Sequence, residues 1–340
     1  MQRWEYVFRR LILAMVVLFS VSLLTFFIAR ILPSDPAAAW VGPRPTQEQI
    51  AKATITLGLD KPLYVQYWRY LSSLLQGDLG VSIKSRQPIL TELKTYLPAT
   101  LELVIASMLI GEIIGIPLGV LSGAKKGGAL DNASRILAVA CVSLPTFFLG
   151  LLFQLIFYAR LGILPISGRV SNEIAINNPV TPITGFYTLD TLMTGNWAAF
   201  QDVFVHLILP AVTLAAFGLG LSVRMTRASI IEVLNEKYIL AARVAGLPYR
   251  TILFVLALKN AIMPTLNVIG LSFVYALTGS ILVEVIFSWP GLGLYLTNAV
   301  LSLDFPVIVS VTLIVAVFYV VVNLVLDLVQ VAIDPRVTLS

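Results

Sequence analysis

The sequence is poor in charged residues, and this shortage excludes an ordinary soluble domain. Asp, Glu, Lys and Arg together make up 12% of the 340 residues, whereas 58% are hydrophobic and the mean hydropathy is +0.91. Soluble globular proteins carry roughly 25% charged residues. The composition therefore predicts an integral membrane protein, and the long apolar stretches predict that it is all-α.

The sequence also has one cysteine and one histidine, Cys141 and His206. A single cysteine excludes a disulfide within the chain and argues against a cysteine metal site, and one histidine cannot form a metal cluster. No Ser-His-Asp arrangement, no His-Glu-x-x-His motif and no carboxylate pair in a defined pocket can be read from the sequence. We therefore expect neither an enzyme nor a metal or cofactor site on this chain.

A phosphate-binding loop of the form Gly-x-x-x-x-Gly-Lys-Ser/Thr is likewise missing from the sequence. Such a loop cradles nucleotide phosphates with its backbone amides. If the protein works with ATP and Mg²⁺, a partner subunit has to bind them.

Six stretches are apolar over about 20 residues, the length that crosses a bilayer as a helix. They lie near 11–31, 99–122, 136–158, 205–223, 263–287 and 306–328. The first could be a signal peptide, since Ala37 to Ala39 offer small residues after it, but its apolar run exceeds the 7–15 residues of a signal-peptide core. We expect an uncleaved helix and six spans.

Lys and Arg residues predict the orientation of these spans. Basic residues precede the first span and fill the second and fourth loops, whereas the short loop after the fifth span has no Lys or Arg. By the positive-inside rule both termini are cytoplasmic. The net charge of +5 follows from these flanking residues and from contact with anionic lipid, so it does not indicate nucleic acid.

The chain divides into three segments by this reading. Residues 1–98 form the first span and a long external loop, in which Pro62 begins an amphipathic helix that Gly77 stops. Residues 99–328 form a five-helix core that includes a cytoplasmic loop at about 224–262. Residues 329–340 form a cytoplasmic tail. A second long external loop covers about 163–204, and loops of that length are usually functional or mobile.

The second span carries four glycines at successive i+4 positions, which share one helix face. They are Gly111, Gly115, Gly119 and Gly123. A stripe of this kind lets another helix approach closely, so we interpret it as a packing face, with direct lining of a substrate path as the alternative.

Four acidic residues lie in or near the spans. Glu112 lies near mid-membrane, where a charged side chain is costly, so it faces protein or a water-filled space, either as a hydrogen-bonded packing residue or as a contact on the translocation path. Glu102, Glu284 and Asp327 lie nearer the interfaces, and we expect hydration to satisfy them. His206 opens the fourth span and is expected at the interface.

The cytoplasmic loop predicts a helix from Thr226 to Ala245, since its apolar residues recur on one face. Gly246 stands where a glycine ends a helix, and Pro248 prevents its continuation. The small side chains at 241, 242 and 245 leave a surface of little bulk. A plain helical connector is the alternative to a docking surface.

This loop resembles the EAA loop of ABC-importer permeases. Two small residues, a glycine four positions later and a distant proline match Ala241 and Ala242, Gly246, and Ile262 with Pro264, although Leu240 stands where the motif has its glutamate. Further runs resemble the dipeptide, oligopeptide and nickel permeases, of the first-permease type. They are Gly-Leu-Asp-Lys-Pro at 58–62, Gly-Asp-Leu-Gly at 77–80, Leu-Pro-Ala-Thr-Leu-Glu-Leu at 97–103, Leu-Gly-Ile-Leu-Pro at 161–165, Phe-Ser-Trp-Pro-Gly-Leu-Gly at 287–293 and Asp-Pro-Arg at 334–336.

The resemblance implies a six-span permease with the type I ABC importer (MetI-like) fold in a prokaryotic inner membrane. It implies four kinds of partner: a second homologous permease, two ATP-binding subunits, an extracytoplasmic solute-binding protein and the lipid bilayer. It also implies an ATPase-docking role for the loop residues Ala241, Ala242, Ala245, Gly246, Ile262 and Pro264. The substrate is then a peptide or a related small solute. The alternatives are a secondary transporter or channel that acts without ATP, and a structural membrane scaffold.

Overall fold

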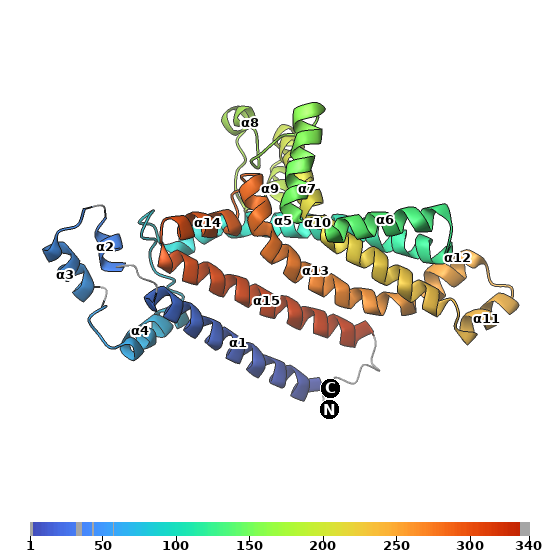
Figure 1. Cartoon of the computed structure of the whole chain (residues 1–340), viewed down its shortest axis with the longest axis horizontal. Helices are drawn as coiled ribbons and strands as arrows, with labels where there is room; N and C mark the ends of the chain where they lie inside the picture. Colours follow the sequence, from blue (N-terminus) through green and yellow to red (C-terminus); the bar gives the residue numbers. More distant parts are fainter. Residues whose placement is uncertain (1–2, 32–35, 43, 57, 334–340) are drawn as a thin grey trace. The chain divides into compact units, whose positions relative to one another are not determined.

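The computed structural model describes residues 3–31, 36–42, 44–56 and 58–333, and the chain divides into two compact units (Figure 1). Unit 1 comprises Met1–Leu97, Tyr295–Leu324 and Thr338–Ser340, and unit 2 comprises Pro98–Leu294 and Val325–Val337. Across the described residues the regular elements are helices, and strand pairing is limited to an isolated bridge between Val81 and Pro88. The predicted all-α class is confirmed.

Unit 1 is built from the N-terminal helices and the C-terminal helical pair. Its elements are α1 (Arg3–Ile31), α2 (Pro36–Val41), α3 (Gln47–Thr56), α4 (Leu63–Leu75), the first turns of α5 (Ile89–Ala124), most of α14 (Leu292–Leu301) and most of α15 (Phe305–Ile333). The helix predicted to begin at Pro62 is confirmed as α4, and Gly77 follows it with a φ of +80°. Phe26 of α1 packs against the rings of Tyr67 and Tyr70 of α4, with ring centroids 5.3 and 5.8 Å apart.

The segment between α4 and α5 is fastened to Asp304, the residue directly before α15. Asp304 is 1% exposed and accepts hydrogen bonds from the Ser82 hydroxyl at 2.6 Å and from the Lys84 amide at 3.0 Å. Tyr295 of α14 stacks on Tyr96 at 4.5 Å between ring centroids. The contact between Ser82 and Asp304 joins residues 222 positions apart in sequence.

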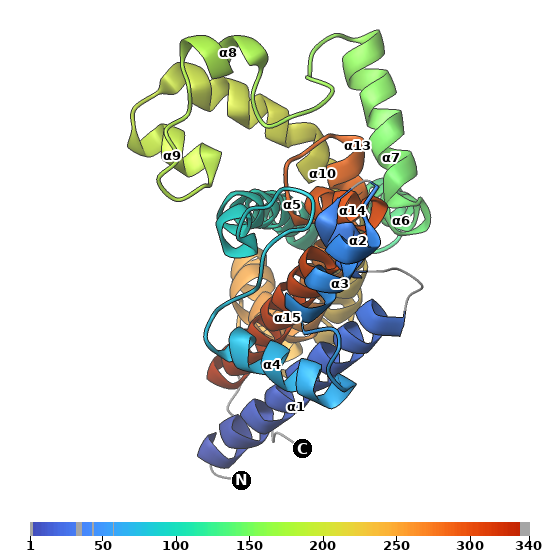
Figure 2. The ribbon, with the colours of Figure 1, turned by 90° about the vertical axis from the view of Figure 1, so that its left-hand side faces the viewer.

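Unit 2 is assembled around one long helix, α10 (Trp197–Val233). The other elements are the rest of α5, α6 (Ala129–Ser143), α7 (Thr146–Phe153), the π-helix η1 (Gln154–Arg160), α8 (Asn172–Asn177), α9 (Tyr187–Met193), α11 (Lys237–Val244), α12 (Tyr249–Thr251), the π-helix η2 (Ile252–Ala257) and α13 (Leu258–Ile286). Helices α6, α7, α9 and α13 all pack on α10. Figure 2 shows α8 and α9 beside the first part of α10.

Four continuous helical segments among the described residues are long and apolar enough to cross a membrane. They are Ile89–Ala124, Trp197–Val233, Tyr249–Ile286 and Phe305–Val325, and α1 contributes a shorter apolar stretch, Ile12–Ile28. The span predicted at 136–158 is not one straight helix, because α6 and the α7–η1 segment meet at 108°. Pro145 causes the break: it lacks an amide proton and holds Leu144 in an extended conformation with ψ 130°.

Candidate functional site

The prediction of one continuous helix from Thr226 to Ala245 was wrong, because a turn divides this segment into two helices. Helix α10 ends at Val233, a turn follows, and α11 begins at Lys237. The Asn235 side-chain amide donates to the Ile231 carbonyl at 2.9 Å, and the Asn235 and Glu236 amides make short-range turn bonds. Asparagine competes in this way with helical hydrogen bonding, which explains where the helix ends.

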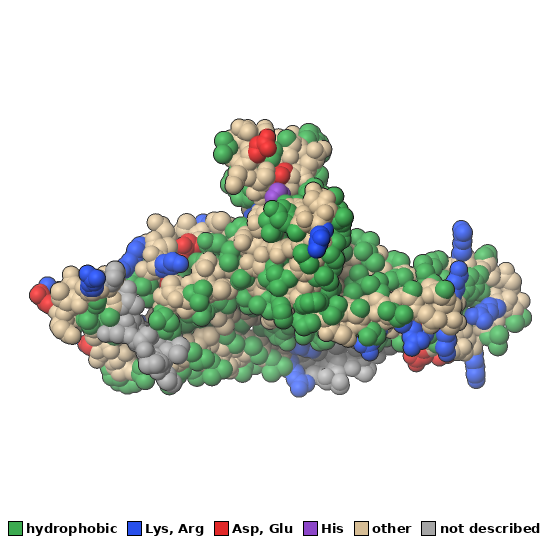
Figure 3. Space-filling model, turned by 45° about the horizontal axis from the view of Figure 1, so that its top comes forward, with side chains coloured by type: hydrophobic (Ala, Val, Ile, Leu, Met, Phe, Trp, Pro, Cys, Tyr) green, Lys and Arg blue, Asp and Glu red, His purple; other side chains and the backbone are tan. Residues whose placement is uncertain are grey.

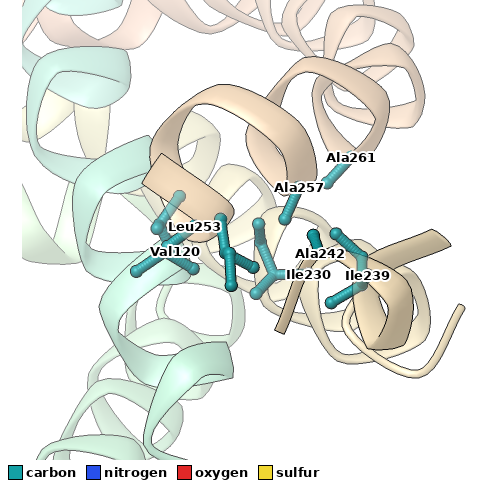
Figure 4. Packing of buried hydrophobic residues seen from close by; sticks show 8 residues of the cluster. Val120, Ile230, Ile239, Ala242, Leu253, Ala257 and Ala261 are labelled. Carbon is teal, nitrogen blue, oxygen red and sulfur yellow. The ribbon is translucent and has the colours of Figure 1, made fainter. Parts of the chain in front are cut away.

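Helix α11 is anchored to unit 2 by its inner face. Ile239 is fully buried and Ala242 is 8% exposed. Both belong to a core cluster that also contains Val120, Ile230, Ile252, Leu253, Ala257 and Ala261, most of which Figure 4 labels. Because these neighbours come from α5, α10, η2 and α13, α11 has a fixed position on the unit.

The outer face of α11 is apolar and exposed. Leu240 is 62% exposed, Val244 is 83% exposed, and Leu247 after the helix is 42% exposed. Ala241 of the same helix and Ala245, its C-cap residue, are exposed as well. We call these five residues, together with Gly246, the α11 face. Three of the four small residues predicted for docking are in it, whereas Ala242 is turned into the core.

Gly246 ends the helix with a φ of +75°, the left-handed region that favours glycine. The Leu247 amide donates to the Ala242 carbonyl at 3.1 Å, and the Gly246 amide donates to the Arg243 carbonyl at 3.0 Å. This pair of bonds is the Schellman pattern of helix ends. A Cβ at Gly246 would meet no atom within 4 Å, so space for a side chain is available in the isolated chain.

Ile262 and Pro264 lie half-buried inside α13 and do not join the α11 face. Another contact connects the two helices: the Asn260 side chain of α13 donates to the Tyr238 hydroxyl of α11 at 2.7 Å. Helix α11 also packs on η2, which runs directly into α13. A displacement of α11 therefore acts on the long helix α13.

Basic side chains surround the α11 face. Figure 3 shows Lys and Arg gathered over the end of unit 2 that carries α11 and α12. The exposed basic residues of the two loops at this end are Lys125, Lys126, Lys237, Arg243, Arg250 and Lys259. Such a gathering is typical of the cytoplasmic end of a membrane protein.

An ion pair ties the first turn of α6 to α10 near this end. Arg227 donates to both carboxylate oxygens of Asp131, at 2.5 and 2.9 Å, and Asp131 is 1% exposed. The Ser122 hydroxyl and the Gly127 amide complete the hydrogen bonding of this carboxylate at 2.7 and 2.8 Å. Sequence reading missed this cluster, because nothing local marks Asp131 as a partner of a residue 96 positions away.

The four glycines of α5 face α10. A Cβ at Gly119 would lie 2.7 Å from Thr226 Cβ and 2.9 Å from the Val223 carbonyl oxygen. The distance from an added Cβ to the nearest atom of α10 is about as short at Gly123 and slightly longer at Gly115. It is longest at Gly111, where the nearest atom would be 3.5 Å away. The two backbones therefore converge toward the end of α5 that precedes the basic loop.

Glu112 accepts a hydrogen bond from the Ser222 hydroxyl at 2.8 Å, which joins α5 to α10 near the first two glycines of the stripe. Glu112 also lines a small cavity to which α13 contributes residues. Glu112 as a whole is half-buried, and its role on a translocation path stays a prediction.

Glu102 is buried by protein, so the prediction that hydration satisfies it was wrong. It is 4% exposed, Arg169 donates to its Oε2, and the Thr188 amide and hydroxyl both donate to its Oε1 at 2.7 Å. The Arg169 guanidinium also lies over the Tyr187 ring at 3.7 Å and over the Trp289 ring at 5.4 Å. The long loop 163–204 is thereby held on the part of α5 that belongs to unit 2.

Asp190 holds the turn of the same loop. It accepts from the Thr184 amide and hydroxyl at 2.8 and 2.7 Å and from the Gly185 amide at 3.0 Å. Burial raises the pKa of Asp190, but these hydrogen bonds together outweigh it and bring the pKa below its ordinary value. The carboxylate is thus ionised at neutral pH and orders the turn.

Glu284 is fully buried as well, so the prediction that hydration satisfies it was also wrong. It accepts from the Thr100 hydroxyl and from the Gly293 amide, both at 2.6 Å, and from the Leu294 amide at 3.0 Å. A Cβ at Gly293 would lie 2.4 Å from Ile281 Cα, so only glycine fits there. The Asp327 side chain lies outside the described residues.

His206 is 9% exposed, and its Nδ1 lies 2.7 Å from the Asp202 carbonyl oxygen, so it is more buried than an interfacial residue would be. Within the described ranges no group of three His, Cys, Asp or Glu side chains could hold a metal ion.

Comparison with known proteins gives matches along nearly the whole chain. The family model of binding-protein-dependent transport system inner membrane components matches residues 115–339, and the model of the N-terminal part of such components matches residues 3–104. The probable D,D-dipeptide transport system permease protein DdpB of Escherichia coli K12 is 42% identical over 98% of this chain and 97% of its own length. The dipeptide transport system permease protein DppB of the same strain is 39% identical, and the glutathione transport system permease protein GsiC of Escherichia coli O6:H1 is 35% identical, each over 98% of both chains.

Proposed function

The chain belongs to the family of binding-protein-dependent transport system inner membrane components, and from this premise we propose that it is the permease subunit through which an ABC importer moves dipeptides or closely related solutes across the membrane. The names of the relatives support the substrate class, since those proteins are permeases for D,D-dipeptides, dipeptides and glutathione. All three classes of solute are small and peptide-like.

The proposed assembly contains a second homologous permease, two ATP-binding subunits and an extracytoplasmic solute-binding protein. ATP and Mg²⁺ belong to the ATP-binding subunits, because this chain has no phosphate-binding loop. The proposed location is the inner membrane with both termini in the cytoplasm. The basic residues around α11 support this orientation.

The α11 face is the proposed docking surface for an ATP-binding subunit. The observation that carries this proposal is an exposed apolar surface on a helix whose opposite face is locked into the core by Ile239 and Ala242. Exposed apolar patches at a polar end of a protein mark interaction sites. A rigidly held helix also transmits force, whereas a loose connector would absorb it.

The contacts of α11 suggest how docking drives transport. When the ATP-binding subunits close, α11 moves with them, and its bond from Asn260 and its packing on η2 pass the displacement to α13. The π-helical turns of η2 lie at the junction, and such turns are frequent at functional sites. Helix α13 would then change its packing on α10 and open the path.

Substitutions in the α11 face test this proposal. Val244→Asp and Gly246→Asp add a charge that docking would have to bury, at a cost of about 1–3 kcal/mol or more. That is about a fivefold to hundredfold weaker docking equilibrium at about 1.4 kcal/mol per factor of ten. We expect both variants to reach normal abundance in the membrane while losing co-purification with the ATP-binding subunit and ATP-driven dipeptide uptake.

Gly246→Ala is the control, since it imposes the backbone strain of the left-handed conformation while adding only a methyl group and no charge. It should keep most of the docking. Normal uptake by Val244→Asp with the ATP-binding subunit still attached would refute the docking role. Dipeptide uptake that is unchanged when the ATP-binding subunit is absent would instead favour an ATP-independent transporter or channel.

A further inference from the structure

A cavity of about 20 Å³ lies inside unit 2 between α5, α7, α10 and α13. Its lining includes Glu112 of α5, Phe217 and Gly218 of α10, and Ser272 and Tyr275 of α13. A space of this size accommodates one water molecule or one small polar group. Tyr275 is 52% exposed, so the cavity adjoins the surface of the unit.

Two polar atoms of this lining have no hydrogen-bond partner among the described residues. They are Glu112 Oε2 and Ser272 Oγ, and both atoms are buried. Ser272 is only 5% exposed, and a Cβ added at Gly218 would lie 3.3 Å from Ser272 Oγ. Buried polar groups normally have partners, so two such atoms in one cavity call for a ligand that donates hydrogen bonds.

The charge of the site selects the kind of donor. Glu112 is a carboxylate with Oε1 already bonded to Ser222, and the cavity lining contains no Lys, Arg or His. A cation would therefore be favoured. A divalent metal is a poor fit, because Ca²⁺ and Mg²⁺ require about six oxygen ligands and favour several carboxylates, whereas the lining has the single carboxylate of Glu112 beside a few hydroxyls.

The aromatic residues beside the cavity also suit a cation. Phe217 and Tyr275 stack with ring centroids 3.9 Å apart. Aromatic rings attract ammonium groups through the negative potential of their faces. A primary ammonium group has the size of the cavity, donates three hydrogen bonds and carries the opposite charge to Glu112.

We propose that Glu112 and Ser272 form a subsite that receives the free α-ammonium group of a peptide as it passes through the permease. The identification of the group as a peptide ammonium rests on the proposed function. The site binds one end of the peptide only, since the cavity is too small for more. Selection of the whole solute is left to the solute-binding protein.

Glu112→Gln tests the charge, because glutamine keeps the volume of the side chain and can still accept a hydrogen bond from Ser222. We expect peptide uptake at least tenfold slower in the reconstituted importer, with normal assembly of the complex. Glu232→Gln, the same change at an exposed site of the same unit, should transport like the wild type. Equal uptake by Glu112→Gln and the wild type would mean that Glu112 only packs, and the proposal would fall.

A second measurement tests the preference of the site for a cation without relying on uptake rates. Ser272→Cys is introduced together with Cys141→Ser, so that the chain has one cysteine, at position 272. The rate at which this cysteine reacts during ATP turnover is then measured with cationic 2-aminoethyl methanethiosulfonate and with anionic 2-sulfonatoethyl methanethiosulfonate. We expect faster reaction with the cationic reagent, and loss of this preference when Glu112→Gln is added. A transported dipeptide should protect the cysteine at least fivefold better than its desamino analogue.

A preference that survives Glu112→Gln, or equal protection by the desamino analogue, would overturn the ammonium subsite. If the wild-type importer moves no peptide at all, the proposed function fails. In that case the reagent preference by itself still decides whether Glu112 makes a cation site. The two failures are therefore distinguishable.

Discussion

The close approach of α5 and α10 makes a sharp prediction about two glycines of one stripe. At Gly119 an added Cβ would lie 2.7 Å from Thr226 Cβ and 2.9 Å from a backbone carbonyl oxygen of α10. At Gly111 the nearest atom would lie 3.5 Å away, which is ordinary van der Waals contact. The same substitution, glycine to alanine, should therefore have opposite effects at the two positions.

The magnitude follows from two opposing terms. Replacing glycine by alanine inside a helix gains about 1 kcal/mol of helix stability. Overpacking a tight contact costs about 1–3 kcal/mol, and the cost is hard to relieve at Gly119 because one of the opposing atoms is backbone. Gly111→Ala should be neutral or stabilising, and Gly119→Ala should be less stable than Gly111→Ala by about 1–3 kcal/mol. That is about a fivefold to hundredfold difference in the folding equilibrium.

The assay compares the midpoint of thermal unfolding of the two purified variants in the same detergent, followed by size-exclusion chromatography of the heated samples. Stability is the quantity to compare, since Gly111 also lines the cavity next to Glu112 and could change transport for a different reason. Equal midpoints, or a lower midpoint for Gly111→Ala, would refute the convergence of the two helices toward Gly123.

Three further predictions concern the buried ion pairs and the orientation. Asp131→Asn leaves Arg227 without its charged partner and should lower the stability of the protein. A double-mutant cycle with Arg227→Met should show coupling between the two residues, and additive effects would exclude the pair as a structural link. Arg169→Lys removes the planar guanidinium that stacks on aromatic rings, so loop 163–204 should become sensitive to limited proteolysis. Unchanged resistance to the protease would contradict the anchoring role of Arg169. In a chain freed of its native cysteine, Ser302→Cys should react with an impermeant maleimide from outside and Lys126→Cys only after permeabilisation, and the reverse pattern would invert the proposed topology.

The sequence by itself was sufficient for features that depend on neighbours along the chain. The scarcity of charge and the long apolar runs predicted a helical membrane protein, and Pro62 and Gly77 correctly bounded α4. Gly246 was identified as a helix end because a left-handed residue after a helix is a local event. The repeat of glycines every four residues likewise showed that they share a face, although not which helix they meet.

Tertiary structure decided everything that depends on partners distant in sequence. Hydropathy suggested that Glu102 and Glu284 reach water, yet Glu102 is paired with Arg169, 67 positions away, and Glu284 with Thr100, 184 positions away, which no local pattern reveals. The burial of the Ala242 side chain depends on the packing of α5, α10, η2 and α13 around it. The cavity beside Glu112 exists only because three long helices bring a carboxylate and a hydroxyl together, and burial without a partner gives those two groups their chemical significance.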